Sequence, residues 1–408
     1  MDKRFSKMFL IIVSLVMILI IISLRFIIND EIYIEDISGD RSALGDMNIV
    51  YQNRKGMYET DNIIISKSGE RIKKYVKEGV LNFPISKENL DNRELLQFSN
   101  DKSNICETEE ETTVVYLFNT YSTYNGNEMK VHVYIKDKKS STIKNYEMAI
   151  DDNINVNGDS IYKVLPIRHG DNIYLAIISS VYKEETLEEN KESSNEADMY
   201  KQTYLSLFKL NLSSQQSKCI LTKSYDPSEM YINGDIGFVK DNIAYFVTKI
   251  KDDTSGKMNT SLFAFNITTK DINIINLEVD NQNITNYYIN NNEVLLCYDE
   301  NTIINKKIKT LMVDLDRKKV IKKNEVETKS KDNYNRYILD MRRDNNKIYI
   351  IMGDYRYDDS IDYGHESQDT YYYIYVINEK NNEILYNGKI KEKIIYNVAF
   401  GIVKDNEL

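Results

Sequence analysis

Short strand-like segments fill most of this 408-residue chain after position 30 and limit what it can fold into. Their apolar residues recur with a period of two, which is typical of half-buried β-strands. In one such segment, alternate residues form an apolar face and a polar face: Met129, Val131, Val133 and Ile135 against Lys130, His132, Tyr134 and Lys136. β-Branched and aromatic residues suit pleated surfaces of this kind. The alternation predicts an all-β domain.

A unit of about 50 residues recurs along this domain, with roughly four strands in each copy. Each copy begins with a turn that ends in asparagine, continues with an apolar strand and a polar loop, and closes with a strand hairpin. The four clearest copies begin near Asn172, Asn242, Asn292 and Asn346, at spacings of 70, 50 and 54 residues. The longest interval contains an acidic insertion, Lys183–Asp198. Residues 112–150 form an earlier copy, and residues 47–100 form a less regular one.

This layout resembles the blades of bacterial β-propellers, in membrane-anchored extracytoplasmic proteins of low-GC Gram-positive bacteria. The resemblance covers residues 47–407 and consists of spacing and polarity pattern. The sequence lacks the Gly-His and Trp-Asp signature of WD40 repeats and the glycines of kelch repeats. The resemblance implies six or seven blades, with the apolar run after Lys393 pairing with an N-terminal strand to close the ring. A pair of β-sandwiches or an irregular β-solenoid is the alternative.

An uncharged stretch of 17 residues, Met8–Leu24, lies near the N-terminus and reaches 21 residues if it is counted to Ile28 past Arg25. A bilayer core of about 30 Å requires roughly 20 helical residues. We therefore expect a transmembrane helix over residues 8–28. Its apolar surface includes Met8, Leu10, Ile12, Leu15, Leu19, Ile22 and Leu24.

The charges beside this stretch predict its orientation. Lys3, Arg4 and Lys7 precede it, and acidic residues follow it. The positive-inside tendency places a tail of residues 1–7 in the cytoplasm and residues 29–408 outside the cell membrane. A cleaved signal peptide is the alternative, although no small residues mark a cleavage site.

Residues 29–46 are interpreted as a junction between the anchor and a domain of residues 47–408. The segment Ile37–Tyr51 has the pattern strand, short helical turn, strand, with Asp40 or Ser42 as the cap of the turn. A longer helix is predicted at Lys87–Leu96, after Ser86.

The charge of the external part excludes one class of partner. Residues 29–408 contain 62 acidic and 49 basic residues, a net charge of −13. We expect no nucleic-acid binding, because phosphate contacts require a basic surface. The three cysteines, Cys106, Cys219 and Cys297, each lie beside apolar strand residues and are predicted to be buried free thiols.

Motifs for catalysis are scarce. His132, His169 and His365 lie far apart in the sequence, and the stretch Asn233–Gly237 lacks the third glycine of a phosphate loop. We therefore expect no enzymatic activity and no cofactor.

The most polar segment, Gly353–Asp369, contains a weak calcium motif. Asp358, Ser360 and Asp362 alternate as oxygen ligands of a calcium loop do, but the glycine stands at the seventh position and Asp369 at the twelfth. A solvated turn is the alternative. The stripe formed by Tyr371, Tyr373 and Tyr375 after it is either a carbohydrate platform or one packed face of a strand.

Taken as a whole, these features predict a membrane-anchored extracytoplasmic protein that binds a protein or a cell-wall ligand, as a scaffold or a sensor. The alternatives are a cell-envelope enzyme, such as a wall-polymer hydrolase or lyase, and an accessory subunit of a membrane complex.

Overall fold

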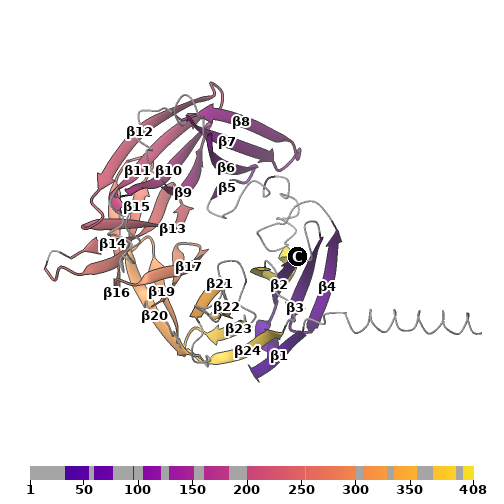
Figure 1. Ribbon diagram of the computed structural model, residues 1–408. Helices are drawn as coiled ribbons and strands as arrows, with labels where there is room; N and C mark the ends of the chain where they lie inside the picture. Colours follow the sequence, from indigo (N-terminus) through magenta and orange to yellow (C-terminus); the bar gives the residue numbers. More distant parts are fainter. Residues whose placement is uncertain are drawn as a thin grey trace, which may run out of the picture.

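The computed structural model describes residues 33–54, 59–76, 95, 104–120, 128–150, 160–182, 200–252, 254–299, 307–328, 335–355, 371–391 and 398–408. These residues form six antiparallel sheets and two short 3-10 helices. The sheets follow one another around a ring in chain order (Figure 1). The prediction of an all-β fold is confirmed, and the arrangement is consistent with a propeller-like one.

The first three sheets contain four strands each. The first consists of β25 (Val398–Lys404), β2 (Met47–Arg54), β3 (Glu59–Ser66) and β4 (Gly69–Val76). The second consists of β5 (Ile105–Glu107), β6 (Glu111–Thr120), β7 (Glu128–Asp137) and β8 (Ile143–Ala149). The third consists of β9 (Ser160–His169), β10 (Asn172–Tyr182), β11 (Tyr200–Asn211) and β12 (Gln216–Tyr225).

The next two sheets repeat this order, and the last has a fifth strand. The fourth consists of β13 (Met230–Lys240), β14 (Ile243–Lys251), β15 (Met258–Asn266) and β16 (Ile272–Asp280). The fifth consists of β17 (Asn283–Asn290), β18 (Glu293–Asp299), β19 (Lys307–Asp314) and β20 (Lys319–Glu327). The sixth consists of β21 (Asn335–Asp344), β22 (Lys347–Tyr355), β23 (Tyr371–Asn378), β24 (Ile384–Lys391) and β1 (Tyr33–Gly39).

Both ends of the chain take part in strand pairs that close the ring. The C-terminal strand β25 is the innermost strand of the first sheet and pairs with β2 along Met47–Asn53. The predicted closure by the last apolar run is confirmed. The N-terminal strand β1 adds to the outer edge of the sixth sheet through β24. Part of the segment interpreted as a junction thus belongs to the sixth sheet.

The helical turn predicted between the first two strands is present. The 3-10 helix η1 spans Arg41–Leu44, and the Asp40 side chain accepts a hydrogen bond from the Ser42 N–H at its start. The second 3-10 helix, η4 (Asp405–Glu407), follows β25. Among the described residues, no helix is both long enough and apolar enough for a membrane span. The predicted span of residues 8–28 lies outside them, as does the predicted helix Lys87–Leu96 except for Leu95, which is helical and buried.

The recurring asparagine turn is the hairpin between the first and second strands of a sheet. Asp241 and Asn242 have φ values of 49° and 61°, and Asn345 and Asn346 have values of 49° and 59°. Two-residue hairpins with positive φ at both positions match the twist of the flanking strands, and asparagine tolerates this conformation better than most residues. In the fourth and sixth sheets, the repeat seen in the sequence is therefore a repeated turn geometry, and in the fifth sheet Asn291 alone has positive φ, at 53°.

A second hairpin, between the third and fourth strands, recurs in five of the sheets. It begins with an aspartate or asparagine whose side-chain oxygen accepts hydrogen bonds from backbone N–H groups of the turn: Asp137, Asn211, Asn266, Asp314 and Asn378. It ends at a residue with positive φ: Ser141, Gln215, Lys270, Lys318 and Asn382. Such side-chain bonds mimic the backbone bonds of a turn and favour these residue types.

Apolar clusters lie between neighbouring sheets. In β10, Leu175 and Ile177 pack toward the second sheet, and Ala176 and Ile178 pack toward the fourth. Central strands are therefore buried on both faces and read as continuous apolar runs, whereas the outer strand β16 alternates between buried and exposed residues. Each fully buried large side chain contributes roughly 1.5–3 kcal/mol.

Replacing Asn346 by valine is expected to lower the free energy of unfolding by about 1–2 kcal/mol, because a β-branched side chain is strained in the left-handed region. Asn346→Gly is the matched control and should unfold at an unchanged or higher urea concentration. Urea unfolding followed by circular dichroism measures both. Equal effects of the two substitutions would contradict the turn geometry.

Candidate functional site

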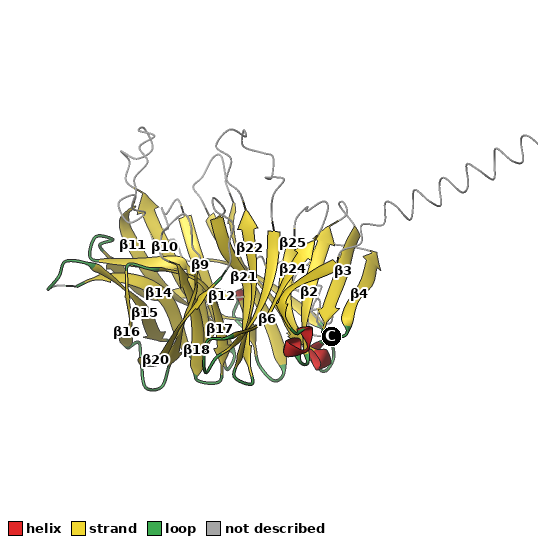
Figure 2. Ribbon diagram, turned by 90° about the horizontal axis from the view of Figure 1, so that it is seen from below, coloured by secondary structure: helices red, strands yellow, loops and turns green. Residues whose placement is uncertain are grey.

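The two faces of the ring differ in their connections. One face carries the turns from first to second and from third to fourth strands, which are two to five residues long. Figure 2 shows most of these turns along its lower edge, together with η1 and η4. We call this the short-turn face. At the opposite face the second and fourth strands of each sheet end. The connections from there to the next strand are up to 28 residues long, as between Val76 and Ile105. We call this the long-connection face.

Buried polar side chains gather near the long-connection face. Each lies within three residues of a strand end at that face: Gln52, Lys163, Ser179, Ser180, Thr203, Thr248, Thr260, Ser261, Lys309, Thr310 and Asp354. Asp354 is only 1% exposed, and Lys309 only 5%. Burial of polar groups costs free energy unless they are hydrogen-bonded. In five of the six sheets, all except the second, the apolar core therefore gives way to a polar layer toward this face.

Hydrogen bonds within this layer hold strand ends together. The hydroxyls of Ser180 and Thr203 lie 3.0 Å apart and join β10 to β11. The Thr260 hydroxyl donates to the Gln282 carbonyl and accepts from the Gln282 N–H, both at 2.9 Å. Since Gln282 directly precedes β17, this pair of bonds links the fourth sheet to the fifth.

Ion pairs link neighbouring sheets at the short-turn face. Arg343 in β21 contacts Glu379 at 2.7 Å and Glu293 of the fifth sheet at 2.5 Å. Arg342 makes a two-point pair with Glu407 in η4, at 2.5 and 2.6 Å. The hydrogen bonds from Arg342 outweigh burial and lower the pKa of the Glu407 carboxyl. Charge-assisted, two-point bonds of this kind fix geometry strongly.

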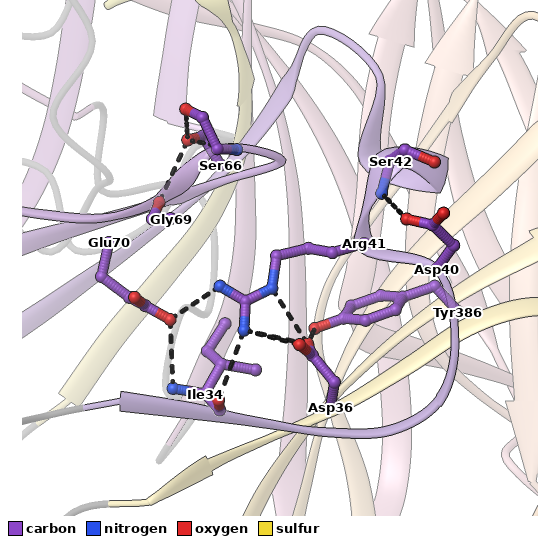
Figure 3. Close-up of polar contacts among 10 residues, drawn as sticks. Ile34, Asp36, Asp40, Arg41, Ser42, Ser66, Gly69, Glu70 and Tyr386 are labelled. Carbon is purple, nitrogen blue, oxygen red and sulfur yellow. Dashed lines mark hydrogen bonds and ion pairs between the residues drawn. The ribbon is translucent and has the colours of Figure 1, made fainter.

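A further polar cluster joins the two ends of the ring, as Figure 3 shows. Arg41, the first residue of η1, donates to Asp36 of β1 from Nε at 2.9 Å and from Nη2 at 3.0 Å. Its Nη1 donates to Glu70 of β4 at 2.8 Å. The Tyr386 hydroxyl of β24 donates to Asp36 at 2.6 Å. We call these four residues the ring-closing cluster, because they connect the sixth sheet to the first.

Protonation in the ring-closing cluster follows from burial and from these bonds. Burial opposes ionisation of Asp36, but the hydrogen bonds from Arg41 and Tyr386 outweigh it and lower the carboxyl pKa. Burial and the Asp36 carboxylate both raise the pKa of Tyr386. The phenol therefore stays protonated and donates to Asp36 at every physiological pH.

Two glycines permit this arrangement. Gly39, at φ 78°, ends β1 so close to β24 that a Cβ there would lie 2.0 Å from the Leu385 carbonyl oxygen. A Cβ at Gly388 would lie 2.4 Å from the Tyr386 hydroxyl oxygen. Only glycine leaves room for the Tyr386 ring over β24.

The calcium candidates Asp358, Ser360 and Asp362 lie outside the described residues, as do His365 and the acidic insertion. In the part of the chain that the structure describes, no group of three or more His, Cys, Asp or Glu side chains could hold a metal ion. His132 lies 3.9 Å from Glu147 across β7 and β8. The His169 ring packs edge-on against Tyr174.

Several other sequence candidates have structural roles. Gly237 lies within β13, packed against Leu165 and Phe246, so the Asn233–Gly237 stretch is a strand and not a phosphate loop. Tyr375 is fully buried and Tyr373 is 7% exposed, so the tyrosine stripe is a packed strand face and not a carbohydrate platform. Val131, Val133 and Ile135 are buried as the alternation predicts.

The cysteines are free thiols, in agreement with the prediction. The predicted burial is confirmed for Cys297, whereas Cys106 and Cys219 are only half-buried. Burial raises the pKa of the Cys106 thiol. A thiol of this kind is a weak nucleophile.

One small cleft opens between the fourth and fifth sheets at the short-turn face, with a volume of about 260 Å³. Tyr245, Asp271 and Lys318 are among its lining residues. Lys318 already donates to Asn273 at 2.9 Å within it. Burial, and to a lesser extent the negative charges of Asp241 and Asp316, raise the pKa of Tyr245 to about 12. Its phenol is therefore neutral.

Comparisons with known proteins do not assign a function. No protein-family model matches the sequence, and no curated protein sequence matches it. Among solved structures, cobalt-substituted Synechocystis ACO aligns with a TM-score of 0.43 and 8% identity over 92% of this chain and 96% of that one. TolB from Acinetobacter baumannii aligns with a TM-score of 0.31 and 10% identity, over 90% of this chain and 67% of that one.

A third solved structure, Kuenenia stuttgartiensis hydrazine synthase, aligns with a TM-score of 0.35 and 10% identity. The alignment covers 64% of this chain and spans 62% of that one. Structural similarities this distant carry no functional conclusion.

Arg41→Met is expected to lower the free energy of unfolding by about 1–3 kcal/mol, because it removes charge-assisted hydrogen bonds to two sheets. Arg317→Met is the matched control. It removes the 3.5 Å pair between the exposed Arg317 guanidinium and Asp314, and it should change stability by less than about 1 kcal/mol. Chemical denaturation of both variants measures the difference, and equal losses would argue against a closing role for Arg41.

The stabilising contribution of Asp36 should depend on pH. Because its pKa is lower in the folded than in the unfolded chain, the contribution is present above about pH 4 and is lost as the pH falls through the folded-state pKa. The difference in unfolding free energy between the native chain and Asp36→Asn should therefore shrink below about pH 4. A difference that stays constant from neutral pH into this range would contradict the proposed ionisation.

Proposed function

We propose that this chain is an extracytoplasmic binding protein, held at the cell membrane by an uncleaved helix over residues 8–28, and that it engages its partner through the long-connection face. In this proposal the six sheets are the blades of a six-bladed propeller. The chain serves as a scaffold or a sensor and does not act as an enzyme.

The distribution of charge between the two faces is the observation that carries this proposal. The twelve segments between strand ends at the long-connection face contain 27 acidic and 13 basic residues, a net charge of −14. Residues 29–408 as a whole contain 62 acidic and 49 basic residues, a net charge of −13. Essentially all of the excess negative charge therefore belongs to segments whose flanking strands end at one face.

The length of the connections supports the same assignment. Loops on a rigid scaffold are where binding residues concentrate, and connections longer than about 12–15 residues are usually functional or disordered. Residues 77–104, 183–199 and 356–370 exceed this length, and all three join strand ends at the long-connection face. At the short-turn face, the described connections between consecutive strands of a sheet are hairpins of two to five residues.

Charge complementarity indicates the kind of partner. A strongly acidic surface attracts basic partners and speeds their association, and it repels polyanions. We therefore propose a protein partner with a basic surface. The buried polar layer beneath the connections gives this face a rigid base.

Photo-cross-linking from intact membranes tests the proposal. A photoreactive residue is placed at Ser255, on the long-connection face, or at Thr269, on the short-turn face. These two positions are well matched: both are exposed, both lie in turns of the fourth sheet, and each side chain accepts one weak bond from the backbone two residues later, at 3.3 and 3.4 Å.

Protein adducts are expected from Ser255 and not from Thr269. A second pair, Ser228 on the long-connection face and Ser213 on the short-turn face, should behave in the same way. Adducts only from the short-turn positions, or none from any position, would overturn the proposed binding face.

A further inference from the structure

The N-terminal strand joins the ring at a defined edge. Tyr33, the first residue of β1, pairs with Lys391, the last residue of β24. Because β24 is the fourth strand of its sheet, its end lies at the long-connection face. From there β1 runs toward the short-turn face, where Gly39 pairs with Tyr386 and η1 follows.

The ring-closing cluster holds β1 in this position. Asp36 is bound by Arg41 and by Tyr386, and Arg41 is bound in turn to Glu70 of the first sheet. The Ile34 N–H also donates to Glu70, at 3.3 Å. Strand β1 is therefore fixed at both of the sheets that meet there and cannot rotate independently of the ring.

Only four residues, 29–32, separate the proposed membrane helix from Tyr33. Fully extended, the five Cα–Cα steps between Ile28 and Tyr33 span at most about 18 Å. The edge at which β1 begins must therefore lie close to the bilayer, while β1 itself leads away from it.

We infer that the ring is mounted with its long-connection face toward the membrane, and that its partner is the basic extracytoplasmic part of another protein in the same membrane. This inference depends on the proposed function for the anchor and for the binding face. The net charge of −14 on the connections opposes direct contact with anionic head groups and favours a basic protein. Because the short tether keeps this face near the bilayer, the basic protein that meets it there is one that the same membrane carries.

The opposite mounting is disfavoured by the same geometry. Strand β15 has nine residues and separates Ser255 from Thr269 by about 30 Å, at roughly 3.3 Å per residue. For the short-turn face to meet the bilayer, the tether would have to pass back along the height of the ring. A tether of at most about 18 Å is too short for that.

Energy transfer to the membrane tests the mounting. The full chain is reconstituted in vesicles of zwitterionic lipid that carry an acceptor dye on their head groups. A donor dye is attached through a non-natural amino acid at Ser255 or at Thr269, so the native cysteines stay in place. Transfer is expected to be several-fold higher from Ser255, given the separation of about 30 Å.

A longer tether provides the control. A flexible spacer of about 12 Gly and Ser residues between Glu31 and Ile32 adds about 20 Å of reach and should reduce the difference between the two positions. A difference that persists unchanged with this spacer would overturn the role of the short tether.

The outcomes separate this inference from the proposed function. A chain that does not co-float with the vesicles overturns the anchor and the mounting together. Co-flotation with equal transfer from both positions, or higher transfer from Thr269, overturns the mounting alone. Anionic lipid should not raise transfer from Ser255, and an increase would assign the face to head groups instead of a protein. In intact membranes, adducts at Ser255 with soluble proteins alone would overturn the membrane-protein partner.

Discussion

Closure of the ring through its two chain ends is the constraint on which the rest of the structure depends. Antiparallel sheets twist, and six of them packed around a ring leave exposed edges and faces unless the first and last are joined. Here β25 supplies the innermost strand of the first sheet, and β1 covers the outer edge of the last. Arg41 then bridges the two sheets through Asp36 and Glu70.

Closure also explains why the two faces can differ so much. With the ring closed by strand pairing and by the ring-closing cluster, the segments that join strand ends at the long-connection face are not needed for closure. Long connections and a polar layer that includes Thr203, Thr260 and Asp354 are tolerated there. The segments that join strand ends at this face therefore vary widely in length, whereas the frame of strands is regular.

Much of the fold could be predicted from sequence because its signals are local. Asparagine turns mark the first hairpin of the fourth, fifth and sixth sheets because residues such as Asn242 and Asn346 must adopt positive φ. The Asp40 cap marks η1 for a similar local reason. Even the pairing of the last apolar run followed from the need of a ring to close.

The position of β1 could not be predicted, because its partner Ile384–Lys391 lies about 350 residues away and alternation cannot identify a partner. The role of Arg41 could not be predicted for the same reason, because Glu70 lies near Arg41 only when the first and sixth sheets meet. The two faces are likewise a product of topology, which brings segments distant in sequence to one side.

The arrangement of the chain ends has a consequence for biosynthesis. Strands β1 and β2 are the first of the ring to be made, yet they pair with Ile384–Lys391 and Val398–Lys404, which are made last. About 345 residues separate each of these strands from its partner, and at roughly 5–20 residues per second their synthesis takes about 17–69 s. During that time the earliest strands have open edges in an extended chain. The remaining sheets can assemble in order as they emerge, but the ring becomes a single cooperative unit only when the final residues arrive. Protection of residues 33–54 by chaperones, or by delayed translocation, would therefore matter more for correct assembly than protection of any later segment.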